Sequence, residues 1–178
     1  MKNELSIYLI TGLMAAGKSK IAQLLAENIE RSVHLRGDIF RKMIISDREE
    51  MTENATEEAI KQLKLRYQIT VQAAKEYYDA GFNVIIQDNY YGKILSEMIE
   101  YLLPYKPRVI VLNPNVETIK KREKYRNKKG YKGFSVEKLY EEFIKETPKI
   151  GFWIDTSNIT PDETVKKILE YHNKRRDT

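Results

Sequence analysis

The chain has 178 residues, of which 42% are hydrophobic and 32% charged, and its net charge is +5 at neutral pH. This length and composition suit a single domain over residues 1–178 and exclude wholesale disorder. The chain has no cysteine, which excludes disulfide scaffolds and iron–sulfur sites, and only two histidines, which excludes multi-histidine metal sites. No apolar run is long enough to span a membrane, so we expect a cytoplasmic protein that does not bind membranes.

Short apolar runs alternate with longer amphipathic stretches along the chain. In chain order, the pattern predicts a strand at 5–11, helix 18–29, strand 32–35, helices 38–45 and 52–80, strand 82–88, helix 92–103, strand 107–112, helices from 115 and over 135–146, strand 152–154 and a last helix from 161. The last helix follows a capping box that begins at Thr160. Strands that alternate with helices predict a parallel sheet covered on both faces, with ligands bound beyond the carboxyl ends of the strands.

A phosphate-binding motif follows the first predicted strand. Residues 12–19, GLMAAGKS, fit the pattern G-x-x-x-x-G-K-[ST] and open the next predicted helix. The glycines let the backbone turn tightly and direct N–H groups toward phosphate oxygens, while the lysine reaches the terminal phosphates and Ser19 ligates Mg²⁺. We therefore expect Lys18 to be catalytic. The residues expected to bind ATP here are Gly12, Leu13, Met14, Ala15, Ala16, Gly17, Lys18 and Ser19.

A carboxylate stands at the end of the second predicted strand, within RGDIFR at 36–41. Phosphoryl transfer to a hydroxyl needs a group that orients the nucleophile and accepts its proton. We expect Asp38 to be this base and to contact the substrate. Arg41, one turn later, is expected to bind a polar or anionic acceptor. The alternative for Asp38 is a capping role at the start of the short helix.

The third predicted strand also ends in a carboxylate, Asp88, which the residues NYYG follow. An aspartate at this place holds Mg²⁺ or binds the acceptor, and we expect a mixed role for Asp88. Tyr90 lies where an acceptor would bind and is a candidate substrate contact. The alternatives are a turn-forming role for Asp88 and ordinary packing for Tyr90.

Basic residues concentrate between positions 120 and 132, where eight of them accompany one acidic residue. Arg122 and Arg126 are four residues apart and share a helix face, and arginine is suited to stabilise a phosphoryl group in transit. Two nearby glycines indicate a helical lid over about residues 117–135 that closes over ATP and excludes water. A solvated helix face is the alternative.

These segments resemble small P-loop kinases, on the branch that includes chloramphenicol phosphotransferase, zeta toxins, shikimate kinase and adenylylsulfate kinase. The chloramphenicol phosphotransferase-like group looks nearest. The matching segments cover most of the chain in family order and are GLMAAGKS at 12–19, RGDIFR at 36–41, VIIQDNYYG at 84–92, VLNPNVETIKKREKYR at 111–126 and WIDTSNITPDETVKKI at 153–168.

The resemblance implies a three-layer α/β P-loop fold with a five-stranded parallel sheet in the order 2-3-1-4-5. It implies that Asp38 is the base and that Arg122 and Arg126 are catalytic lid residues, with Arg122 also in contact with ATP. It further implies that the loop after the last strand borders the adenine, through Thr156, Ser157 and Asn158. We expect an ATP-dependent phosphotransferase that uses Mg²⁺ and moves the γ-phosphate of ATP to a hydroxyl of a small molecule.

Two other functions fit the same residues. A kinase acting on the 5′-hydroxyl end of a nucleic acid would use the positive charge, and its binding would weaken steeply with salt. We rank it second, because ATP itself accounts for the basic residues. A non-catalytic sensor would bind ATP without producing ADP. The acceptor region at 46–66 is charged rather than apolar, which disfavours an apolar antibiotic as the substrate.

Overall fold

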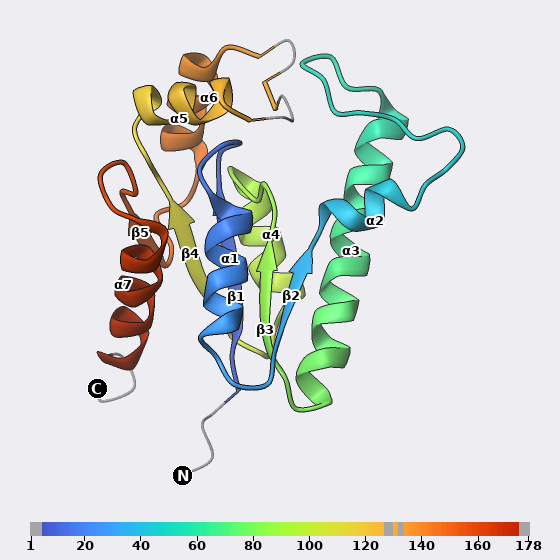
Figure 1. Ribbon diagram of the computed structural model, residues 1–178. Helices are drawn as coiled ribbons and strands as arrows, with labels where there is room; N and C mark the ends of the chain where they lie inside the picture. The colour runs from blue at the N-terminus through green and yellow to red at the C-terminus, as the bar shows by residue number, and fades with distance from the viewer. Residues whose placement is uncertain (1–4, 127–129, 132–133, 175–178) are drawn as a thin grey trace.

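In the computed structural model, residues 5–126, 130–131 and 134–174 are described (Figure 1). Their five strands form one parallel sheet in the order β2-β3-β1-β4-β5, which confirms the predicted order. The central strands are fully buried, as expected for a parallel sheet covered on both faces. The strands are β1 (Ile7–Gly12), β2 (Ser32–Arg36), β3 (Asn83–Gln87), β4 (Arg108–Leu112) and β5 (Phe152–Ile154).

Helices lie on both faces of the sheet, so the fold has the predicted three layers. One apolar cluster packs α1 and α7 against one face, and a second packs α3 and α4 against the other. Helices α5 and α6 lie above the carboxyl ends of the strands (Figure 1). The helices are α1 (Lys18–Glu27), α2 (Asp38–Lys42), α3 (Glu57–Asp79), α4 (Lys93–Tyr101), α5 (Val116–Lys124), α6 (Val136–Glu146) and α7 (Pro161–Lys174).

Side-chain caps set where several helices begin. The predicted capping box is present, because the Glu163 N–H donates to the Thr160 hydroxyl at 3.2 Å while the Thr160 N–H donates to the Glu163 carboxylate at 2.7 Å. The predicted start of the long helix at residue 52 is wrong. The Thr56 hydroxyl accepts a hydrogen bond from the Ala59 N–H, and α3 begins at Glu57 for this reason.

The parallel strands bring the predicted functional segments to one edge of the sheet. Gly12 ends β1 beside Leu112 of β4, and a Cβ at position 12 would overlap the Leu112 carbonyl oxygen. Only glycine therefore lets the phosphate-binding loop leave β1 so close to β4. Asp38 and Asp88 follow the neighbouring strands β2 and β3, so both carboxylates reach the same edge.

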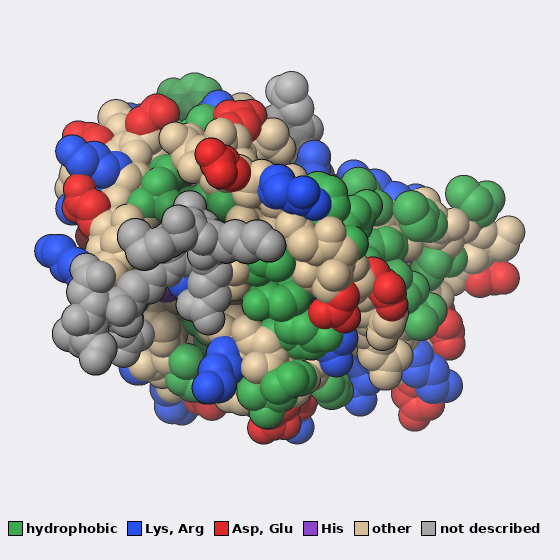
Figure 2. All heavy atoms as spheres, turned by 90° about the horizontal axis from the view of Figure 1, so that it is seen from below, with side chains coloured by type: hydrophobic (Ala, Val, Ile, Leu, Met, Phe, Trp, Pro, Cys, Tyr) green, Lys and Arg blue, Asp and Glu red, His purple; other side chains and the backbone are tan. Residues whose placement is uncertain are grey.

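The segment at 43–56 between α2 and α3 projects from one side of the molecule (Figures 1 and 2). The region predicted to be charged, 46–66, overlaps this segment, but the segment also exposes Met43 and Ile45, and Figure 2 shows hydrophobic side chains at the projecting tip. None of the described helices combines the length and apolar character needed to cross a bilayer.

Candidate active site

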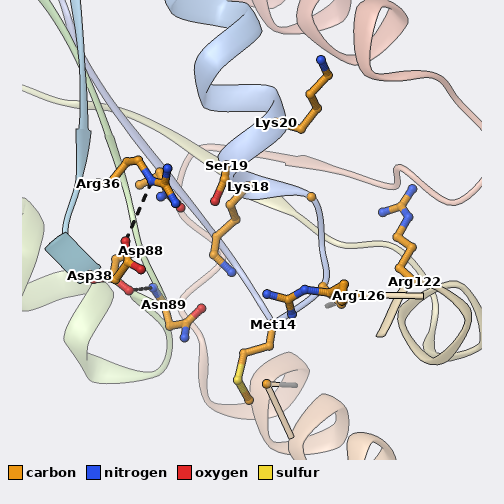
Figure 3. Close-up of a pocket in the computed structure, with 14 residues that line it drawn as sticks. Met14, Lys18, Ser19, Lys20, Arg36, Asp38, Asp88, Asn89, Arg122 and Arg126 are labelled. Carbon is orange, nitrogen blue, oxygen red and sulfur yellow. Dashed lines mark hydrogen bonds and ion pairs between the residues drawn. The ribbon is translucent and has the colours of Figure 1, made fainter. Parts of the chain in front are cut away.

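A cavity of about 460 Å³ opens at the carboxyl ends of the strands (Figure 3). Its wall combines the phosphate-binding loop, the ends of β2 and β3, and the region that follows β4. The residues that line it are Met14, Ala15, Gly17, Lys18, Ser19, Lys20, Arg36, Asp38, Gln87, Asp88, Asn89, Arg122, Arg126 and Gly130.

The phosphate-binding loop holds Lys18 at the base of the cavity. The Lys18 ammonium donates to the carbonyl oxygens of Gly12 and Leu13, both at 2.8 Å. The side chain is buried, and this burial lowers the pKa of Lys18 to about 7, against the opposing effect of Asp88 and with a smaller lowering effect from Arg126. Among the described residues, the hydrogen-bond partners of this buried ammonium are carbonyl oxygens, which an anionic ligand can replace.

Asp38 occupies the first turn of α2 and faces the cavity. Its carboxylate lies 3.9 Å from the guanidinium of Arg36 and 3.3 Å from the ammonium of Lys42. Figure 3 shows Asp38 and Arg36 on the opposite side of the cavity from Arg122 and Arg126. The predicted base therefore shares one cavity with Lys18 and Ser19.

Asp88 is held at the cavity wall by a buried ion pair that comes from α3. Its Oδ2 atom lies 3.1 Å from Nε of Arg66, and its Oδ1 atom accepts a hydrogen bond from the Asn89 N–H at 2.8 Å. Burial raises the pKa of Asp88, and Arg66 and the Asn89 N–H oppose this rise. Above the pair lies Gly37, where a Cβ would overlap Oδ2 of Asp88.

Arg122 connects the phosphate-binding loop to the loop after β5. Its guanidinium donates to the Ala16 carbonyl at 3.1 Å and to the Thr156 carbonyl at 2.7 Å. These bonds hold Thr156 near the cavity, although Thr156 itself does not line it. The Ser157 hydroxyl instead accepts a hydrogen bond from the Asn115 N–H at 2.8 Å, and Asn158 is exposed.

The residues after α5 lie against the phosphate-binding loop. Arg126 donates to the buried carboxylate of Glu123 at 2.9 Å, and the Gly130 N–H donates to the same carboxylate. The Tyr131 hydroxyl donates to the Met14 carbonyl at 2.8 Å. Part of the predicted lid therefore contacts the loop, whereas its residues 127–129 and 132–133 lie outside the described residues.

A comparison with protein families matches the model of the AAA domain to residues 7–139, which is more than half of the chain. This chain belongs to the AAA domain family. A search of curated protein sequences finds no significant match.

Solved structures share the fold of this AAA domain. The tunicamycin resistance protein of Deinococcus radiodurans is 13% identical and superposes with a TM-score of 0.69 over 94% of this chain and 95% of its own. The shikimate kinase of Acinetobacter baumannii is 19% identical, with a TM-score of 0.64 over 98% of this chain and 96% of its own. A gluconokinase of Sinorhizobium meliloti is 14% identical, with a TM-score of 0.59 over 93% of this chain and 90% of its own. The predicted resemblance to small P-loop kinases is thus confirmed at the level of the fold.

Two predicted substrate residues of the AAA domain do not line the cavity. Arg41 points its guanidinium to Glu50, which belongs to the projecting segment. Tyr90 is fully buried, and its ring packs edge-on against Tyr67, with the ring centroids 5.2 Å apart. Tyr90 therefore supports the cavity wall from behind and has no surface open to an acceptor.

Sequence reasoning missed Arg66, Arg36 and Lys20, and it did not single out Asn89 within the segment that follows the third strand. Arg36 and Lys20 directly flank the segments at 37–38 and 12–19 that follow two strands, so a wider search around each strand end could have found them. Arg66 carried no such signal, because it lies ten residues into an amphipathic helix where a charged residue is expected to face water.

The described carboxylates of this AAA domain do not form a preformed metal cage. Within the residues that the structure describes, no group of three or more histidine, cysteine, aspartate or glutamate side chains is arranged to hold a metal ion. Asp88 and Ser19 nevertheless line the cavity, and Oδ2 of Asp88 accepts no hydrogen bond there despite its ion pair. These residues fit Mg²⁺, which commonly takes one or two protein ligands and completes its shell with water and phosphate oxygens.

Proposed function

We propose that this protein is an ATP-dependent phosphotransferase that moves the γ-phosphate of ATP to a hydroxyl of a small molecule. The observation that carries the proposal is the shared cavity, in which Lys18 and Ser19 of the phosphate-binding loop lie across from the carboxylate of Asp38. A loop that holds phosphates and a carboxylate that accepts a proton are the two parts that this reaction needs.

In the proposed reaction, Asp38 accepts the proton of the acceptor hydroxyl as its oxygen attacks the γ-phosphorus. The bond between the acceptor oxygen and phosphorus forms, the bond between phosphorus and the β,γ-bridging oxygen breaks, and ADP leaves. Lys18 gives up its hydrogen bonds to the Gly12 and Leu13 carbonyls and donates to the terminal phosphates. The proton on Asp38 returns to solvent after the product leaves.

Ser19 and Asp88 would hold Mg²⁺ in this site. When bound, the ion neutralises negative charge on the β- and γ-phosphates. The ion pair with Arg66 keeps the Asp88 carboxylate at the cavity wall, because a buried carboxylate without a partner is strongly disfavoured.

The proposal extends to the surroundings of the nucleotide. Residues 1–178 act as one domain in which the segment at about 117–135 covers ATP and excludes water. The bond from Tyr131 to the Met14 carbonyl supports a lid that docks on the phosphate-binding loop. Thr156, Ser157 and Asn158 are proposed to border the adenine, and the fixed position of Thr156 beside Arg122 supports this.

The test is ADP release from Mg·ATP with a panel of acceptors, namely nucleosides, sugars, hydroxylated acids, hydroxylated antibiotics and a 5′-hydroxyl oligonucleotide. We expect one class to stimulate release, and Asp38→Asn to reduce the stimulated rate by about 10²–10⁴-fold while ATP still binds. The matched control is Asp162→Asn, at an exposed carboxylate on α7, which leaves the rate unchanged.

The panel separates the proposal from the two other functions. Stimulation by the oligonucleotide alone, with binding that weakens steeply in salt, would favour the nucleic-acid end kinase. Tight ATP binding without ADP release under any acceptor would favour the sensor. A normal stimulated rate in Asp38→Asn would remove Asp38 from the role of base.

A further inference from the structure

Arg36, the last residue of β2, is a cavity-lining arginine whose guanidinium makes a long ion pair with Asp38. Its side chain is 47% exposed, and its nearest charged partner, the Asp38 carboxylate, lies 3.9 Å away, beyond hydrogen-bond distance. Over the described part of the chain, the Arg36 side chain donates no hydrogen bond. Its N–H donors are therefore available to a ligand in the cavity.

The geometry of β2 and α1 shows where this guanidinium points. His34 of β2 faces α1, because its Nδ1 atom lies 3.0 Å from the side-chain oxygen of Gln23. From His34 to Arg36, β2 advances about 6.6 Å and keeps the same face toward α1. Helix α1 runs antiparallel to β2, so the four residues from Gln23 back to Ser19 cover about 6 Å in the same direction. Arg36 therefore lies across from Ser19, as Figure 3 also shows.

The other two arginines of the cavity are engaged by protein groups. Arg122 donates to the carbonyls of Ala16 and Thr156, and Arg126 donates to the carboxylate of Glu123. Arg122 thereby joins two loops, and Arg126 is oriented by a carboxylate three residues before it. Of the three cavity arginines, Arg36 is the one whose side chain donates no hydrogen bond within the described residues, and it lines the cavity together with Ser19 and the proposed base.

We infer that Arg36 binds the terminal phosphate of ATP and stabilises its charge during transfer, an inference that rests on the proposed function. The transferring group must pass between the phosphate-binding loop and the acceptor hydroxyl. Ser19 belongs to that loop, Asp38 receives the hydroxyl proton, and Arg36 lies beside both. A planar guanidinium can donate two hydrogen bonds to phosphate oxygens as their charge develops, and it keeps its own protons throughout.

The inference predicts discrimination between ADP and an ATP analogue. The probes are ADP and the non-hydrolysable analogue AMP-PNP, both with Mg²⁺, measured by calorimetry on the full chain. Removal of a charge-assisted hydrogen bond to the γ-phosphate weakens binding by about tenfold. We therefore expect Arg36→Met to weaken AMP-PNP binding about tenfold and to leave ADP binding unchanged, with an intermediate effect for Arg36→Lys.

A matched control removes the same charge from the opposite end of the same strand. Arg31 directly precedes β2, and its guanidinium lies 5.2 Å from the centre of the Phe82 ring and donates to the Gly81 carbonyl. Arg31→Met should leave the affinities for both nucleotides unchanged. Thermal unfolding of each variant shows whether the fold is intact.

Three results would overturn the inference. Equal weakening of ADP and AMP-PNP in Arg36→Met would assign Arg36 to the α- and β-phosphates or to the fold. Unchanged binding of both nucleotides would remove Arg36 from the phosphate site. A rise in the acceptor KM as the sole change would instead assign Arg36 to an anionic group of the acceptor. Failure of the wild-type protein to bind either nucleotide would count against the proposed function itself, so the two failures are distinguishable.

Discussion

The Nε atom of Arg66 lies 3.1 Å from Oδ2 of Asp88, and both side chains are buried, with Asp88 lining the cavity at the carboxyl ends of the strands. Arg66 comes from the middle of α3 and Asp88 from the end of β3, so the pair ties the helix to the edge of the sheet that carries the site. The same pairing keeps the Asp88 carboxylate oriented toward the cavity.

Removal of Arg66 alone should destabilise the fold strongly. Arg66→Met leaves Asp88 buried without its cation, and such a loss is worth about 3–5 kcal/mol. The double variant Arg66→Met/Asp88→Leu should recover much of the lost free energy of unfolding, because no buried charge remains. Urea unfolding of Arg66→Met, Asp88→Leu and the double variant measures the interaction energy of the two side chains. If the loss of unfolding free energy in the double variant equals the sum of the losses in the two single variants, the two groups do not interact.

Gly37 should allow Asp88 its position because it has no side chain to overlap the carboxylate. Gly37 has ordinary helical dihedral angles, so alanine fits its backbone, but the added Cβ would overlap Oδ2 of Asp88. We expect Gly37→Ala to lower the stimulated rate of ADP release about tenfold or more, because a displacement of a positioned group by about 1 Å is already damaging.

Gly92 offers the matched comparison for Gly37. It has open space around it but a φ of 59°, so Gly92→Ala strains the backbone without touching the site. This variant should lose about 1–3 kcal/mol of unfolding free energy and keep its turnover, because the φ/ψ pair of Gly92 is one that almost only glycine adopts. Equal turnover in Gly37→Ala and Gly92→Ala would contradict the steric role of Gly37.

Lys18 should destabilise the nucleotide-free protein. Its pKa of about 7 in the folded state lies below its ordinary value of 10.5, so the unfolded chain binds the extra proton between these pH values. The free energy of unfolding therefore rises with pH across this window, and the penalty is fully present below pH 7.

Replacement of Lys18 by methionine should remove that penalty. Lys18→Met is expected to gain about 2 kcal/mol of stability below pH 7, because one pKa unit corresponds to about 1.4 kcal/mol and two hydrogen bonds to carbonyls are lost in exchange. The gain should shrink toward pH 10.5, and nucleotide binding should be lost. Urea unfolding at several pH values tests this, and a gain independent of pH would contradict it.

Arg122 should affect all nucleotides alike. Its bonds to the carbonyls of Ala16 and Thr156 hold two loops together and do not depend on a γ-phosphate. Arg122→Met is therefore expected to weaken ADP and AMP-PNP binding equally, by about tenfold. A selective loss of AMP-PNP binding in calorimetry would instead show that Arg122 contacts the terminal phosphate.

The strands and helices could be read from the sequence because their signals are local. Apolar runs predicted β1 and β3 within a few residues, and the side-chain caps at Asn115, Ser135 and Thr160 fit where three helices begin. The start of α3 was misjudged, because the polar residues before Thr56 continue the helical pattern without forming the helix.

The phosphate-binding loop and the two strand-end carboxylates were also visible in the sequence. The loop is eight consecutive residues whose backbone makes the site, and the ends of parallel strands must share one edge of the sheet. For these residues, position along the chain already implies position in space. The places of Lys18, Asp38 and Asp88 around one cavity agree with this reasoning.

Only the tertiary structure decided which of the many charged side chains face that cavity. Each residue turns a helix by about 100°, so a small change in how a helix packs decides whether a side chain faces the site or the solvent. Arg66 faces inward to Asp88, whereas Arg41 turns away to Glu50. The sequence by itself determined the sheet and the phosphate-binding loop through local periodicity and contiguous residues, whereas the partners of each arginine depended on contacts between elements far apart in the chain.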